Sequence, residues 1–147
     1  MEQKFRCDCP ITTALDVLGD KWMLVIVKQM LIDGKRTFKD FRESDEAVSS
    51  NILSTKLKLL EKVGILFKSK LPNNKKTVLY NLTERGLALT PVVVELAVWS
   101  YENMREFNSI LRKGDELSLM KSDKAAFAEA LVQKYKEEQA KILSQGS

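Results

Sequence analysis

Apolar residues in the first half of the chain recur at helical spacing in four short segments. The expected helices cover residues 12–18, 21–32, 38–43 and 49–62. The second is apolar on nearly every side, which predicts a central position in the core. Gly34 and Gly64 follow the second and fourth segments, where a helix commonly ends on a glycine with left-handed backbone. The third and fourth segments, two short helices joined by a tight turn, have the outline of a helix-turn-helix.

The fourth segment has two unlike faces. One face is a stripe of leucines, Leu53, Leu57 and Leu60. The opposite face carries only small hydrogen-bonding groups and lysines: Ser50, Asn51, Ser54, Thr55, Lys58 and Lys62. Either Ser49 or Ser50 is expected to cap the start of this helix, as Thr37 is expected to cap the start of the third segment.

The pattern changes after Gly64. Residues 65–71 and 77–83 alternate as strands do, and residues 72–76, PNNKK, separate them as a turn. A two-stranded hairpin that directly follows a helix-turn-helix predicts the wing of a winged helix, at about residues 66–82.

The remainder of the chain is expected to contain a helix start, a long apolar segment, a linker and a final helix. A helix is expected to start at Thr83, and residues 91–111 carry more apolar side chains than one helix of a small domain buries, which predicts a partner surface. Residues 113–123 have the composition of a linker, and residues 125–143 predict a final helix.

Positive charge is concentrated around the fourth segment and the hairpin. The chain has a net charge of +4, but residues 49–76 contain seven lysines and a single acid, Glu61, so this stretch alone carries +6. A surface that binds a polyanion concentrates charge in this way. A solvated lysine-rich face is the alternative interpretation.

Residue types that catalysis and metal binding need are scarce. The chain has no histidine, which removes the usual general base and the usual zinc ligand, and its two cysteines cannot complete a structural zinc site. No phosphate-binding or nucleophile motif is present. We therefore expect no enzymatic activity, no metal and no cofactor. No apolar run is long enough to cross a membrane and the N-terminal residues lack the pattern of a signal peptide, so we expect a cytoplasmic protein.

The polar face of the fourth segment suits the major groove of double-stranded DNA. Hydroxyls, an amide and lysines donate hydrogen bonds and neutralise phosphates, whereas acidic side chains would be repelled. The side chains expected at base edges or phosphates are Ser49, Ser50, Asn51, Ser54, Thr55 and Lys58, with Lys75 and Lys76 from the tip of the hairpin.

Several short motifs occur in a fixed order along most of the chain. They are Cys9-Pro10, GDKW at residues 19–22, F-x-x-F at 38–41, L-x-x-x-L-x-x-L-E at 53–61, Gly64, Y-x-L-T-x-x-G at 80–86 and Trp99. In their order and spacing the chain resembles the HxlR-type regulators, winged-helix proteins related to the MarR group.

The resemblance implies a homodimeric transcription factor that binds a palindromic operator, by default as a repressor. The expected fold is mainly α with a small β-hairpin: a winged helix-turn-helix with N- and C-terminal dimerisation helices. Residues 1–112 would form this DNA-binding and dimerisation domain, and residues 113–147 a linker and an additional C-terminal helix. The position before Phe38, commonly arginine in the family, is Thr37 here, so the neighbouring Arg36 is the candidate phosphate contact.

Several HxlR-type proteins sense oxidants or electrophiles through a cysteine near the N-terminus, and Cys9 falls on that position. Lys4 and Arg6 are expected to lower the pKa of its thiol, against the opposing charge of Asp8, and Cys7 is a second candidate redox residue. The alternative for Cys9 is a reduced cysteine with no sensing role.

Two other functions remain open for the whole chain. One is a winged-helix module for protein interaction, with the basic face solvated or bound to an acidic partner. The other is a small-molecule-responsive regulator whose effector pocket would be lined by Trp22, Phe67, Tyr80 and Trp99.

Overall fold

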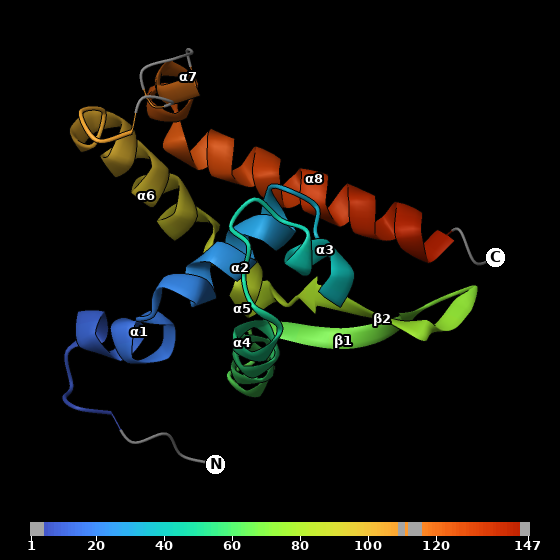
Figure 1. Ribbon diagram of the computed structural model, residues 1–147. Helices are drawn as coiled ribbons and strands as arrows, with labels where there is room; N and C mark the ends of the chain where they lie inside the picture. Colours follow the sequence, from blue (N-terminus) through green and yellow to red (C-terminus); the bar gives the residue numbers. More distant parts are fainter. Residues whose placement is uncertain (1–4, 109–110, 112–115, 145–147) are drawn as a thin grey trace.

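The computed structural model describes residues 5–108, 111 and 116–144. Over these residues the elements follow in the order α1 (Pro10–Leu18), α2 (Lys21–Leu31), α3 (Phe38–Arg42), α4 (Ser50–Lys62), β1 (Leu66–Leu71), β2 (Asn74–Leu82), α5 (Glu84–Leu87), α6 (Thr90–Asn103), α7 (Glu116–Ser122) and α8 (Lys124–Ser144). The fold is mainly α with a two-stranded antiparallel sheet, as predicted (Figure 1). None of the described helices is long and apolar enough to cross a membrane.

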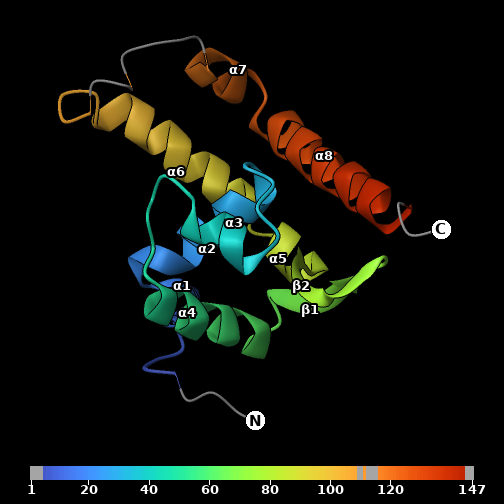
Figure 2. The ribbon, with the colours of Figure 1, turned by 45° about the vertical axis from the view of Figure 1, so that its right-hand side comes forward.

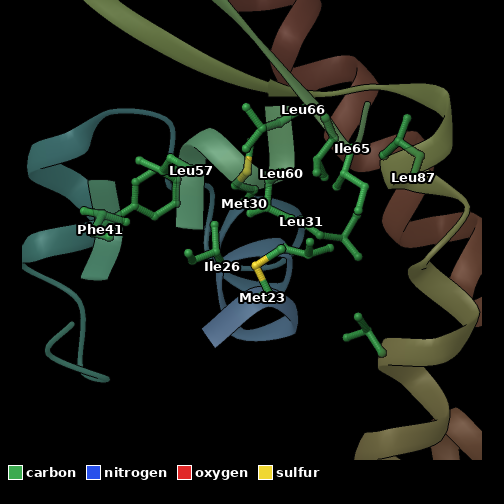
Figure 3. Packing of buried hydrophobic residues seen from close by; sticks show 14 of the residues in the cluster. Met23, Ile26, Met30, Leu31, Phe41, Leu57, Leu60, Ile65, Leu66 and Leu87 are labelled. Atoms are coloured by element: carbon green, nitrogen blue, oxygen red, sulfur yellow. The ribbon is translucent and has the colours of Figure 1, made fainter. Parts of the chain in front are cut away.

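Helix α2 lies at the centre of the main hydrophobic core, as its apolar pattern predicts. Ile26, Val27 and Met30 have no exposed surface. The leucine stripe of α4 packs against them from one side, and Figure 3 shows Leu57 and Leu60 among side chains from α2, α3 and the start of β1. The stripe therefore fixes which face of α4 points away from the protein.

Residues next to the helix termini fix where the helices around this core begin and end. The Thr37 hydroxyl accepts a hydrogen bond from the Asp40 backbone N–H at 3.1 Å, and the Asp40 carboxylate accepts one from the Thr37 N–H at 3.1 Å, a reciprocal capping box. Gly34 and Gly64 have φ of 69° and 79°, the left-handed backbone predicted at both helix ends.

The wing, formed by β1 and β2, has a tighter turn than the sequence predicts. Leu66 pairs with Leu82 and the register shifts after Lys70, so that only Pro72-Asn73 forms the turn. Lys75 and Lys76 therefore lie in β2 near the tip, not in a five-residue loop. Pairing continues this far because exposed polar side chains do not prevent backbone hydrogen bonding between the strands.

Two other boundaries differ from the sequence prediction. Helix α1 begins at Pro10 and not at residue 12, because proline is well suited to the first position of a helix. The segment 113–123 was expected to be a linker, but its described part contains α7, whose Met120 is buried in a second apolar cluster with Val94 and Val98 of α6. Tertiary packing stabilises this short helix despite its polar composition.

Helix α8 extends from Lys124 to Ser144 and lies against the rest of the fold. Figure 2 shows it on the side of the core opposite to α4. Tyr135 places α8 in the main hydrophobic cluster, with 1% of its surface exposed. The final helix therefore packs on the same core as the helix-turn-helix.

Candidate nucleic-acid interface

The polar face of α4 is exposed to solvent over its first two turns. Ser50, Asn51, Thr55 and Lys58 are exposed, and Ser54 is half-buried. The Thr55 hydroxyl donates to the backbone carbonyl of Asn51 at 2.9 Å, which leaves the oxygen lone pairs of Thr55 available. These five side chains, all predicted from the sequence, share one open surface.

Ser49 and Ser50 have different roles at the start of α4. The Ser49 hydroxyl accepts a hydrogen bond from the Ile52 N–H at 3.4 Å, so Ser49 is the helix cap. Ser50 is the first helical residue and its side chain is exposed. The alternative left open by the sequence is therefore decided in favour of Ser49 as the cap.

Asp20 holds α4 against the start of α2. One carboxylate oxygen accepts hydrogen bonds from the N–H groups of Trp22 and Met23 at 2.7 and 3.2 Å, and the other pairs with the Lys56 ammonium of α4. Partial burial opposes the charge, but the hydrogen bonds from Lys56 and from these N–H groups outweigh it and hold the pKa of Asp20 below its ordinary value. The GDKW motif thus positions the exposed helix.

The lysines around α4 divide into paired and unpaired groups. Lys56 is taken by Asp20, and Lys68 lies 3.7 Å from Glu61. Within the described parts of the chain, the other lysines of residues 49–76 have no acidic partner: Lys58, Lys62, Lys70, Lys75 and Lys76. All five are exposed and belong to α4 or the wing, so the positive surface predicted from the sequence persists in the fold.

The wing follows α4, and in Figure 1 it extends to the right of α4 and α5, with its tip near the level of the C-terminal end of α8. Lys75 and Lys76 occupy consecutive strand positions near its tip. Lys70 lies on the other strand, next to the register shift. Lys70 was not among the residues predicted to contact DNA, because only the strand pairing, which places it opposite Val78, shows that it lies on the wing beside the strand of Lys75 and Lys76.

Arg36 is not part of this surface. Only 5% of the residue is exposed, because α8 covers it. Its guanidinium carbon lies 4.4 Å from the centre of the Tyr135 ring, and Nη1 donates to the Tyr135 hydroxyl at 3.2 Å. The prediction of Arg36 as a phosphate contact is therefore not supported by its position: in this structure the guanidinium faces α8.

Cys9 is the N-cap of α1, and its side chain is exposed and unpaired, as is that of Cys7. The Thr12 backbone N–H, the Thr12 hydroxyl and the Ile11 N–H favour the thiolate and lower the pKa of the Cys9 thiol. Arg6 was expected to do this, but its guanidinium bonds the Asp16 carboxylate at 2.5 Å instead. Lys4 lies outside the described residues.

The aromatic residues suggested for an effector pocket do not lie together. Tyr80 packs edge-on against Phe41 in the core, with ring centres 6.0 Å apart, while Phe67 and Trp99 are exposed on different elements. A mainly apolar groove of about 650 Å³ lies elsewhere, between α2, α6, α7 and α8. Over the residues that the structure describes, no three potential metal ligands cluster.

A family model described as HxlR-like helix-turn-helix matches residues 17–108 of the chain. The curated protein YodB of Bacillus subtilis, an HTH-type transcriptional regulator, is 36% identical over 93 residues, which cover 63% of this chain and 82% of YodB. The redox regulator HypR in its oxidized form matches in structure with 34% identity and a TM-score of 0.57, over 65% of this chain and 97% of HypR. Quinone-bound YodB from B. subtilis matches with 32% identity and a TM-score of 0.53, over 65% of this chain and 99% of that one.

These relatives are transcriptional regulators and not enzymes, in agreement with the scarcity of catalytic residue types. The matched region includes α2 to α6, with the exposed face of α4 and the wing. The chain therefore belongs to the HxlR-like helix-turn-helix family of transcriptional regulators.

Proposed function

We propose that the chain binds a palindromic DNA operator as a homodimer, with α4 in the major groove and the wing on the flanking backbone, and acts as a repressor. The observation that carries this proposal is the exposed polar face of α4 together with five exposed lysines on α4 and the wing that have no acidic partner in the described structure. An operator-bound dimer blocks access of the polymerase to a promoter that overlaps it.

The side chains of this surface have two kinds of role in the proposed complex. Ser50, Asn51, Ser54 and Thr55 lie on the first turns of α4, where hydroxyl and amide groups reach base edges. Lys58, Lys75 and Lys76 neutralise phosphates and fix the register of the protein on the duplex. Ser49 contributes chiefly by capping α4, whose free N–H groups and positive end favour a nearby phosphate.

The dimer proposal rests on apolar surface that the single chain leaves uncovered. Helix α1 has no buried residue, and its Ile11 and Leu15 are 72% and 55% exposed. On α6, Val92, Leu96 and Trp99 recur at helical spacing and are also exposed. Contact with a second copy would remove this surface from water. Twofold symmetry would then place the two α4 helices about 34 Å apart, one turn of DNA.

A charge placed on α1 tests this interface. Leu15→Asp should shift the protein from dimer to monomer in sedimentation and weaken operator binding, because the charged group would lose its water at the interface. Leu143→Asp, on α8 at a similarly exposed position (57%), is the matched control and should remain dimeric. A parent protein that sediments as a monomer at working concentration would refute the dimer.

We further propose that Cys9 makes the regulator responsive to oxidants or quinones. HypR is described as a redox regulator, and YodB has been solved with quinone bound. A thiol with a lowered pKa provides the thiolate whose electron pair forms an S–C bond to a quinone ring carbon. The ring oxygen takes up a proton from water and the hydrogen of the attacked carbon transfers to the second oxygen, so that the product is a thioether of the hydroquinone. Because Cys9 directly precedes α1, such an adduct would alter the proposed dimer interface and thus the spacing of the two α4 helices.

The direct experiment is fluorescence anisotropy on the duplex upstream of the protein's own gene, measured across salt concentrations, with a scrambled duplex of equal length. Selective binding to the native duplex that is lost in Asn51→Ala supports the operator proposal. Lys134→Ala, on an exposed site of α8, is the control variant. Benzoquinone should then lower the affinity of the parent and leave Cys9→Ser unaffected; an equal effect on both would exclude Cys9 as the sensor.

Protein interaction is the competing function for the same surface. An acidic protein partner would use the lysines but would not require a specific base sequence. Equal and salt-sensitive binding to the native and scrambled duplexes would leave only a basic surface and would favour this alternative.

A further inference from the structure

Helix α8 contacts the base of the wing, although it lies outside the region that the family model matches. That match ends at residue 108, and α8 begins at Lys124. In Figure 2 α8 runs past α3 toward the strands. Its buried side chain at this point is Tyr135, and the described contacts of Tyr135 reach two other elements.

The Tyr135 hydroxyl joins the wing to the segment before α3. It accepts a hydrogen bond from the backbone N–H of Leu82, the last residue of β2, at 2.8 Å. It also accepts one from Arg36 Nη1 at 3.2 Å, while the Tyr135 carbonyl accepts from Nη2 at 3.4 Å. The guanidinium stacks on the ring, so the orientation of both side chains is fixed.

The backbone of Arg36 extends the same connection. Its carbonyl accepts the Tyr80 N–H of β2 at 2.7 Å, and its own N–H donates to the Asp40 carboxylate of α3 at 3.0 Å. Arg36 therefore links α3 of the helix-turn-helix, β2 of the wing and α8. The buried guanidinium keeps partners on α8, because the hydroxyl and the backbone carbonyl of Tyr135 accept hydrogen bonds from it and the Tyr135 ring stacks on it.

Two weaker contacts follow along α8. Gln139 Nε2 donates to the Asn81 side-chain oxygen at 3.4 Å, and Lys136 lies 3.4 Å from the Glu84 carboxylate. Helix α8 thus contacts Asn81, Leu82 and Glu84, where the wing ends and α5 begins. A two-stranded hairpin has little stability of its own, so its direction depends on what holds its base.

From this geometry we infer that Tyr135 is a positioning residue for DNA binding: through Leu82 and Arg36 it sets the direction of the wing relative to α4. The inference rests on the proposed function, in which wing lysines contact phosphate. Without the hydroxyl, the buried Leu82 N–H and the Arg36 guanidinium lose a shared acceptor. Lys75 and Lys76, at the far end of the hairpin, would then be displaced the most.

The test is a double-mutant cycle on operator affinity. Tyr135→Phe removes only the hydroxyl and should weaken binding about tenfold at moderate salt and reduce the salt dependence. In a background of Lys75→Gln with Lys76→Gln, the same change should have little further effect, because the contacts it misplaces are already absent. Tyr101→Phe is the matched control; its hydroxyl donates to Glu116 at 2.6 Å on α7, away from the wing.

The outcomes separate the inference from the proposed function. Loss of affinity in the parent background alone supports a positioning role. Equal loss in both backgrounds, or no loss in either, overturns it, while operator binding by the parent stands. If the parent itself shows no preference for the operator, the proposed function fails and the inference with it. Thermal unfolding shows whether the Tyr135→Phe variant is folded. If it is not, the cycle is repeated with Gln139→Ala, which removes the half-buried contact between α8 and Asn81.

Discussion

Neutralising the tip of the wing provides the sharpest test of how the protein binds DNA. Lys75 and Lys76 are exposed, have no acidic partner in the described structure, and occupy consecutive positions of β2. Consecutive strand residues point to opposite faces of the hairpin. In each wing, either both lysines contact phosphate or only the lysine on the face toward the DNA does. The number of phosphates neutralised in a dimer is therefore four or two.

The magnitude follows from counterion release. Each phosphate contact contributes about 0.9 to the slope of log affinity against log salt, so Lys75→Gln with Lys76→Gln should reduce the slope by about 3.6 if all four lysines contact DNA. The reduction is about 1.8 if one lysine of each wing does so. If the parent and the variant bind equally at 1 M salt, a slope difference of about 3.6 makes the variant about a thousandfold weaker than the parent at 0.15 M salt.

The assay is fluorescence anisotropy on the operator duplex at several salt concentrations. The control is Lys121→Gln with Lys124→Gln, which removes the same charge from the α7–α8 region, where these lysines pair with Glu102 and Glu95 at 3.2 and 2.9 Å. This control should change the slope by less than about one. An equal change from both pairs of substitutions would show that net charge, and not the wing, governs binding.

Three further predictions concern the core, the thiol and the junction between α2 and α4. Leu60→Ala removes a fully buried side chain and should lower the free energy of unfolding by about 3 kcal/mol in urea titrations, against less than about 1 kcal/mol for Leu59→Ala, whose parent residue is 39% exposed; equal losses would contradict the assigned face of α4. Alkylation of Cys9, followed by mass spectrometry, should have its pH midpoint below the ordinary thiol pKa, and Thr12→Val should raise it; an unchanged midpoint would refute the contribution of the Thr12 hydroxyl. Asp20→Ala should lower the free energy of unfolding at neutral pH, and the difference from the parent should shrink in acid. A depressed carboxyl pKa contributes stability that is present above the unfolded-state pKa and lost as the pH falls through the folded-state pKa. A difference that does not depend on pH would exclude this linkage.

The sequence by itself determined the features that depend on near neighbours in the chain. The leucine spacing of residues 53–60 required one buried stripe, and therefore an exposed polar face, whatever lay beneath it. Thr37 and Ser49 cap their helices through N–H groups three residues away. Gly34 has a positive φ because the end of α2 requires a backbone conformation that other residues adopt at a cost. These interactions act over a single turn, so the local pattern contains the information.

Only the tertiary structure decided which charges remain on the surface. Lys56 and Lys68 look like their unpaired neighbours in the sequence, and the fold brings Asp20 to the first and Glu61 to the second. Arg36 shows the same limit more strongly, since its guanidinium is covered by Tyr135, which lies 99 residues away. Periodicity reveals that a helix has a buried face but not which element covers it, because that choice depends on the packing of the whole chain. The proposed contact surface for DNA was therefore predictable as a face of α4. The exclusion of Arg36 from that surface, and the contacts between α8 and the base of the wing, depend on the packing of the distant helix α8.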